Sequence, residues 1–142
     1  MRNLYPILIL AILLSACCSN KDLKEFSKNQ IIFGSGGGFT GATDLYALDY
    51  KGQLQKYNSL SKETIDLPAI PAKEAKGYFR SFLEHGFDTL EYSSPGNMTY
   101  FIGYKNDSTD KRINWGAGQE SPEGVQEYYN SLLKTVSNNN KE

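Results

Sequence analysis

Two stretches of this chain place their apolar residues at the spacing of one helix face. The first stretch contains Ala75, Tyr78, Phe79, Phe82 and Leu83, and the second contains Val125, Tyr128, Tyr129, Leu132, Leu133 and Val136. Positions i, i+3, i+4 and i+7 lie on the same side of an α-helix, so each stretch predicts an amphipathic helix with an apolar stripe to bury. We expect Gly86 to end the first helix, and Ser121 and Pro122 to open the second as its N-cap and first residue.

Several other stretches have the residue types and turn boundaries of β-strands. The clearest case is residues 98–104, where Met98, Tyr100, Ile102 and Tyr104 alternate with Thr99, Phe101 and Gly103. Strands are also predicted at 30–34, 44–50, 54–57, 87–92 and 112–115. Helices that must cover an apolar sheet face predict an α+β domain, a small antiparallel sheet with two amphipathic helices packed against it.

The amino-terminal residues have the pattern of an export signal. Arg2 precedes the apolar run Leu4 to Leu14, which is too short to span a bilayer as a helix, and Leu14-Ser15-Ala16-Cys17 follows. This segment resembles the lipobox of bacterial lipoproteins, which implies cleavage before Cys17 and attachment of the chain to the lipid bilayer through that cysteine. An ordinary signal peptide with an incidental cysteine is the alternative. Residues 18–20 contain no aspartate beside the cysteine, which favours an outer-membrane anchor that faces the periplasm.

This interpretation divides the chain into four parts. Residues 1–16 are the signal peptide, 17–29 the lipidated anchor and a polar tether, 30–136 a single α+β domain, and 137–142 a disordered tail without apolar residues. The domain is long enough to bury one ordinary hydrophobic core.

Composition argues against several functional classes. The chain has 15 Lys and Arg and 16 Asp and Glu, interleaved along its length, so it lacks the basic stripe typical of nucleic-acid binding. Its two cysteines are Cys17 and Cys18 and its one histidine is His85, which disfavours a zinc site; we predict no metal and no cofactor. His85 is expected at the carboxyl end of the first helix. Catalysis would require the fold to bring an acid and a nucleophile to it, and we expect a protein that is not an enzyme.

A glycine-rich segment supplies the candidate binding site. Gly36, Gly38 and Gly41 satisfy the G-x-G-x-x-G pattern of dinucleotide-binding loops, but a strand rather than a helix is expected to follow, so a hairpin loop is favoured. We predict a partner-binding surface made by Gly36, Gly37, Gly38, Phe39, Thr40, Gly41 and Trp115. In this hypothesis Phe39 and Trp115 form one aromatic contact surface, and the alternative for Phe39 is that it folds back onto the core.

The segment from Gly37 to Gly41, together with the order of strands and helices that follows, resembles the emfourin family of small bacterial inhibitors of thermolysin-like metalloproteases. Thr40 stands where that family usually has alanine. The chain also resembles small lipoproteins of Bacteroidota-type bacteria, which implies no activity. The resemblance to emfourins implies a membrane-anchored, non-catalytic protein that binds a secreted or periplasmic protease. The alternative is a structural or accessory envelope lipoprotein that binds another envelope protein or none.

Overall fold

The computed structural model describes residues 19–141. The predicted signal peptide and the predicted lipidation site at Cys17 lie outside these residues, so both stay predictions. Within the described part, no helix is long and apolar enough to cross a membrane.

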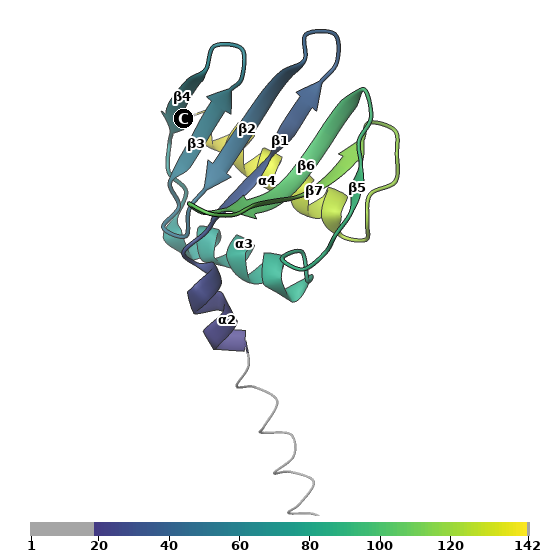
Figure 1. The fold of residues 1–142 in the computed structure, drawn as a ribbon. Helices are drawn as coiled ribbons and strands as arrows, with labels where there is room; N and C mark the ends of the chain where they lie inside the picture. The colour runs from purple at the N-terminus through teal and green to yellow at the C-terminus, as the bar shows by residue number, and fades with distance from the viewer. Residues whose placement is uncertain (1–18, 142) are drawn as a thin grey trace, which may run out of the picture.

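Residues 19–141 form three helices and one sheet of seven strands (Figure 1). The helices are α2 (Ser19–Phe26), α3 (Ala72–Glu84) and α4 (Val125–Asn139). The strands are β1 (Gln30–Gly37), β2 (Ala42–Leu48), β3 (Leu54–Asn58), β4 (Glu63–Leu67), β5 (Ser93–Ser94), β6 (Met98–Lys105) and β7 (Asp110–Gly116). Their order across the sheet is β4-β3-β2-β1-β6-β7-β5.

The predicted α+β class is confirmed, but the sheet is larger than the small antiparallel sheet that we expected. From β4 to β7 in the order across the sheet, each strand pairs antiparallel with the next, whereas β5 runs parallel to β7. The parallel pair arises because the connection after α3 returns along the outer side of β7, where Asn114 donates its backbone N–H to the Tyr92 carbonyl at 3.1 Å. Residues 87–92, predicted as a strand, are turn and irregular backbone that leads into β5.

The core lies between one face of the sheet and helices α3 and α4, which Figure 1 shows on the same side. Alternate residues of the strands reach it, as Ile31 and Phe33 do from β1. Helix α3 contributes Phe79 and Phe82, which are both fully buried. Burial of a side chain of this size stabilises a fold by about 1.5 to 3 kcal/mol. The other buried residues of α3 and α4 are Ala75 on α3 and Val125, Tyr128, Tyr129, Leu132 and Val136 on α4.

The folded part begins earlier than residue 30, because part of the expected tether is helix α2. Phe26 at its end is 7% exposed, and its ring centroid lies 5.7 Å from that of Phe79, 5.3 Å from Phe82 and 5.2 Å from Tyr104. Leu23 packs against the same core. Residues i and i+3 share a helix face, so two apolar residues suffice to dock this short helix. Residues 19–26 of the expected tether are therefore helical.

Both ends of α4 also differ from the expectation. The N-cap is Gly124, with φ 76°, rather than Ser121, because residues 122–125 first make a turn in which Val125 donates to the Pro122 carbonyl at 3.1 Å. At the other end the helix continues to Asn139, whose side-chain amide donates to the Pro68 carbonyl. Residues 137–139, expected to be disordered, are therefore helical.

Candidate functional site

The glycine segment is the end of β1 and the turn of the β1–β2 hairpin, as predicted. Strand β1 includes Gly36 and ends at Gly37, residues 38–41 form the turn, and β2 follows directly, so no helix opens after the glycines. Gly38 and Gly41 have φ values of 70° and 64°, a left-handed conformation that glycine adopts without steric cost. The pattern that resembles a dinucleotide-binding loop thus lacks the helix N-terminus that such a loop needs.

Phe39 lies in this turn with a relative exposure of 107%. Its neighbours in the turn are Gly38, Thr40 and Gly41, so nearby side chains offer the ring little to pack against. The alternative in which Phe39 folds back onto the core is therefore wrong. An aromatic ring that is entirely in water gains about 1.5 to 3 kcal/mol when another surface covers it.

The turn that carries Phe39 is fixed to its neighbours. Gly38 donates its backbone N–H to the Asn97 carbonyl at 2.7 Å, and Gly41 donates to the Gly38 carbonyl at 3.3 Å. A Cβ atom at Gly37, where φ is 107°, would collide with the Asn97 carbonyl oxygen, so the loop before β6 lies directly against the hairpin. Phe39 is therefore held on a braced hairpin, and little conformational freedom is lost when a partner covers it.

A second exposed apolar residue, Leu60, lies at the same end of the sheet in the turn between β3 and β4 (Figure 1). The two hairpins are joined at this level: Thr43 donates its N–H to Ser59 Oγ at 2.7 Å, and Ser59 donates its N–H to the Thr43 carbonyl at 2.9 Å. Asn58 Oδ1 accepts the amide of Leu60 at 2.9 Å, which shapes the turn. We call the turns 38–41 and 59–62 the distal end, since α2 lies at the opposite end of the sheet. Sequence analysis missed Leu60, although the Asn58-Ser59-Leu60-Ser61 turn pattern could have identified it.

Trp115 is not part of this surface, and the prediction that it joins Phe39 there is wrong. It is 1% exposed, and its ring centroid lies 6.0 Å from Tyr100 and 5.4 Å from Tyr129. Its indole Nε1–H donates to Gln126 Oε1 at 3.0 Å. Trp115 follows Ile113 by two residues on β7, so both side chains face the helix layer.

His85 is the C-cap of α3, at the helix end where it was predicted. Its Nδ1 lies 2.8 Å from the Ser81 carbonyl and 3.3 Å from Ser81 Oγ, and its ring stacks on Phe87 at 5.2 Å. The catalytic alternative needed an acid beside the ring. The contacts that the structure gives instead tie the histidine to its own helix and to the loop that follows.

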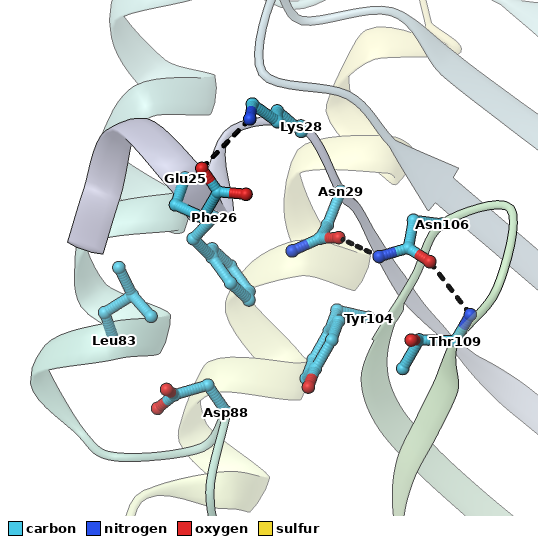
Figure 2. A pocket seen from close by; sticks show the side chains of 9 residues that line it. All are labelled: Glu25, Phe26, Lys28, Asn29, Leu83, Asp88, Tyr104, Asn106 and Thr109. Atoms are coloured by element: carbon cyan, nitrogen blue, oxygen red, sulfur yellow. Dashed lines mark hydrogen bonds and ion pairs between the residues drawn. The ribbon is translucent and has the colours of Figure 1, made fainter. Parts of the chain in front are cut away.

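A hollow of about 400 Å³ lies at the α2 end of the molecule, between α2, the end of α3 and the β6–β7 turn (Figure 2). Four of its polar side chains form two pairs: Lys28 Nζ lies 2.9 Å from Glu25 Oε2, and Asn106 Nδ2 donates to Asn29 Oδ1 at 2.8 Å. The full lining is Glu25, Phe26, Lys28, Asn29, Leu83, Asp88, Tyr104, Asn106 and Thr109. The Asn29–Asn106 pair ties the segment after α2 to the β6–β7 turn. In residues 19–141, no three His, Cys, Asp or Glu side chains are arranged to hold a metal ion.

Among the residues that the structure describes, three groups have clearly shifted pKa values, and none of them lies in the distal turns. Burial raises the pKa of the Tyr128 phenol well above its usual range and that of Tyr129 to about 12. The hydrogen bond from Arg112 lowers the pKa of Asp110. What the distal end does present is the exposed apolar surface of Phe39 and Leu60.

No protein-family model matches this chain, and no curated protein matches it either. The resemblance to emfourins thus stays a prediction that rests on Gly37 to Gly41, which here form the end of β1 and the turn beside it.

Proposed function

We propose that this chain is a membrane-anchored, non-catalytic protein-binding lipoprotein in which Phe39 anchors the partner. The observation that carries the proposal is the complete exposure of Phe39 on a braced hairpin turn. Large aromatic residues that insert into a pocket of the partner supply much of the free energy of protein–protein binding. The exposure of Leu60 at the same end adds a second apolar contact.

The position of the distal end supports a partner away from the membrane. Helix α2 begins at Ser19, two residues after the proposed lipidation site at Cys17. Because α2 and the turn with Phe39 lie at opposite ends of the sheet, a lipid at Cys17 would hold the α2 end at the bilayer (Figure 1). Phe39 would then point into the periplasm from the outer membrane. This arrangement favours a protein partner over a lipid for the exposed ring.

The most specific form of the proposal is a protease inhibitor. The resemblance of Gly37–Gly41 to the emfourin segment supports it, and the mechanism would be occlusion, in which the hairpin turn blocks access to the protease. The lipid anchor would keep the inhibitor concentrated at the envelope. The alternative function, a structural or accessory envelope lipoprotein, needs no exposed anchor residue.

The test is a titration of residues 19–142, which carry the complete core, against a thermolysin-like metalloprotease and against unrelated serine and cysteine proteases. We expect stoichiometric loss of metalloprotease activity alone, weakened about 30-fold or more by Phe39→Ala, as for a hot-spot residue. Ile65→Ala is the matched control, because Ile65 is an exposed apolar residue on β4 outside the distal turns. No inhibition by the folded domain would refute the inhibitor, and equal losses in both variants would refute Phe39 as its anchor.

The lipid anchor is tested separately in the full chain. Labelled fatty acid should be incorporated by the wild type and by Cys18→Ser, but not by Cys17→Ser. Labelling that survives the loss of Cys17 would refute the proposed attachment site.

A further inference from the structure

Helix α3 carries a row of positive charges on the side that faces away from the core. Lys73, Lys76 and Arg80 lie at positions i, i+3 and i+7, which share one face of a helix, and all three are exposed. None of the three takes part in an ion pair within residues 19–141. These cations are therefore free to contact a negatively charged surface outside the domain.

The turn between β2 and β3 adds a fourth exposed cation, Lys51, which is also in no ion pair of the described residues. Lys76 Nζ lies 5.6 Å from the centroid of the Tyr50 ring, next to Lys51 along the chain. The turn is fixed to the segment before α3, because Ile70 donates its backbone N–H to the Gly52 carbonyl at 2.9 Å. The turn and the row on α3 thus form one surface, which we call the basic face: Lys51, Lys73, Lys76 and Arg80.

The acids nearest to this face do not cancel its charge. Glu74 Oε1, on the α4 side of α3, accepts a hydrogen bond from Thr135 Oγ1 at 3.1 Å. Asp49 Oδ1 accepts two backbone N–H groups of its own turn, both at 2.9 Å. Glu84 is exposed at the end of α3, one turn after the row. With Asp49 and Glu84 counted against the four cations, the basic face keeps an excess of two positive charges.

The basic face lies at the α2 end of the molecule (Figure 1). Strand β1 begins shortly after α2 and β2 runs back antiparallel to it, so the β2–β3 turn is at the end where α2 lies. Lys76 and Arg80 are also in line with Leu83, at i, i+4 and i+7, and Leu83 lines the hollow beside α2 together with Phe26. The row on α3 therefore borders α2, whose first residue is two positions after Cys17.

We propose that the basic face rests on the bilayer surface and binds the phosphate groups of anionic phospholipids. This inference rests on the proposed anchor at Cys17, which would bring the α2 end to the membrane. Each Lys or Arg close to an anionic surface strengthens binding by roughly 5-fold, and the attraction acts over about 10 Å at moderate salt. The lipid would keep the domain at the membrane, and the basic face would determine which side of the domain contacts it. The distal end then points away from the bilayer.

The test uses residues 19–142 without a lipid, so that a failed anchor and a failed basic face give different results. Cosedimentation in low salt compares vesicles of phosphatidylglycerol and phosphatidylcholine in equal parts with vesicles of phosphatidylcholine alone. We expect about 10-fold or more stronger binding to the anionic vesicles, and loss of this difference in high salt. Lys76→Gln should weaken the binding by about 5-fold. The matched control Lys62→Gln, which removes an exposed lysine of the distal end, should leave it unchanged.

Three results would overturn the proposal, whatever the fatty-acid labelling at Cys17 shows. The first is no binding to the anionic vesicles, or equal binding to both kinds of vesicle. The second is an equal loss in Lys76→Gln and Lys62→Gln, because the attraction would then not come from the basic face. The third is binding to a DNA duplex without binding to the vesicles, which would assign the face to a soluble polyanion. Both lysines are exposed, so the variants should keep the circular dichroism of the wild type.

A polarity-sensitive dye on an introduced cysteine tests the orientation, since residues 19–142 contain no cysteine. Gly77 lies on α3 beside the row of cations, and a Cβ atom there would meet no other part of the protein within 4 Å. Gly77→Cys therefore places the dye in open space on the outer side of α3, and Ser61→Cys places it in a distal turn. On anionic vesicles the emission should shift to the blue at position 77 and not at position 61. Equal shifts, or a shift at position 61 alone, would contradict the orientation.

Discussion

The two aromatic residues singled out in the sequence should respond oppositely to truncation. Trp115 is 1% exposed and packs against Tyr100 and Tyr129, so Trp115→Ala removes a large core side chain and should lower the free energy of unfolding by about 3 to 5 kcal/mol. Phe39 is 107% exposed, so Phe39→Ala removes no contact within the domain and should change that free energy by less than about 0.5 kcal/mol. A domain of this size is typically stable by about 5 to 15 kcal/mol, so a loss of about 3 to 5 kcal/mol removes a large share of the stability and should lower the urea midpoint strongly.

Urea unfolding followed by circular dichroism measures both variants. The fluorescence of the wild type adds an independent check, because Trp115 is the one tryptophan of the chain. Its emission should be blue-shifted and resistant to iodide until the domain unfolds. If Phe39→Ala lowers stability by more than about 1 kcal/mol, the ring packs on the domain in solution, and the argument for an exposed anchor fails. A tryptophan that iodide quenches in the folded state would refute the burial of Trp115.

Three further predictions follow from local geometry and burial. Lys62 has φ 57°, a left-handed conformation that glycine adopts without steric cost. Lys62→Gly should therefore raise the free energy of unfolding by up to about 1 kcal/mol and the urea midpoint with it. An unchanged or lower midpoint would show that Lys62 is not strained in this turn. Phe26→Ala should lower the free energy of unfolding by about 3 to 5 kcal/mol, and a loss below about 1 kcal/mol would mean that α2 does not dock in solution. Burial raises the pKa of Tyr129 to about 12, so its phenol stays protonated in the folded state while the unfolded chain ionises near 10.0. The contribution of the raised Tyr129 pKa to stability is therefore complete below pH 10.0 and lost as the pH rises to about 12. The tyrosinate absorbance of the wild type minus that of Tyr129→Phe should give the titration curve of Tyr129. A midpoint of that curve near 10.0 would contradict the raised pKa.

Much of the fold could be predicted because its elements bury one side. Helix α3 carries its buried residues at positions 75, 79 and 82, as the spacing predicted, whereas β6 was found from its alternating sequence although Phe101, Ile102 and Gly103 are all buried. Strand β4 was missed because its first four residues are exposed, so burial imposes no alternation on them. Strand β5 has only two residues, Ser93 and Ser94, which are too few for any periodic signal. Strands that are stabilised mainly by backbone pairing have no apolar pattern from which they could be predicted.

The start of α4 shows how a correct local rule can select the wrong residue. Ser121 and Pro122 are a good N-cap pair by themselves. In the structure, however, His85 lies against Gly124, where a Cβ atom would come within 3.2 Å of the His85 ring. The close approach of the loop after α3 favours glycine at this position, and its φ of 76° starts the helix there. That contact joins segments far apart in the sequence, so capping preferences alone could not identify it.

The sequence located Phe39 on an exposed turn correctly but placed Trp115 on the same surface wrongly, and the geometry of strands explains the difference. Trp115 and Phe39 both stand beside glycines, and this similarity led to their assignment to one surface. They differ in what lies two residues away, the distance at which strand side chains share a face. Ile113 precedes Trp115 at this spacing, so the two side chains lie on the same buried face of β7. Gly37 and Gly41 lie at the same distance from Phe39 and have no side chains. An aromatic residue with glycine at both i−2 and i+2 has no companion on its own face. Its exposure then depends on whether another element crosses the turn, and in this fold α3 and α4 cover the sheet without reaching Phe39.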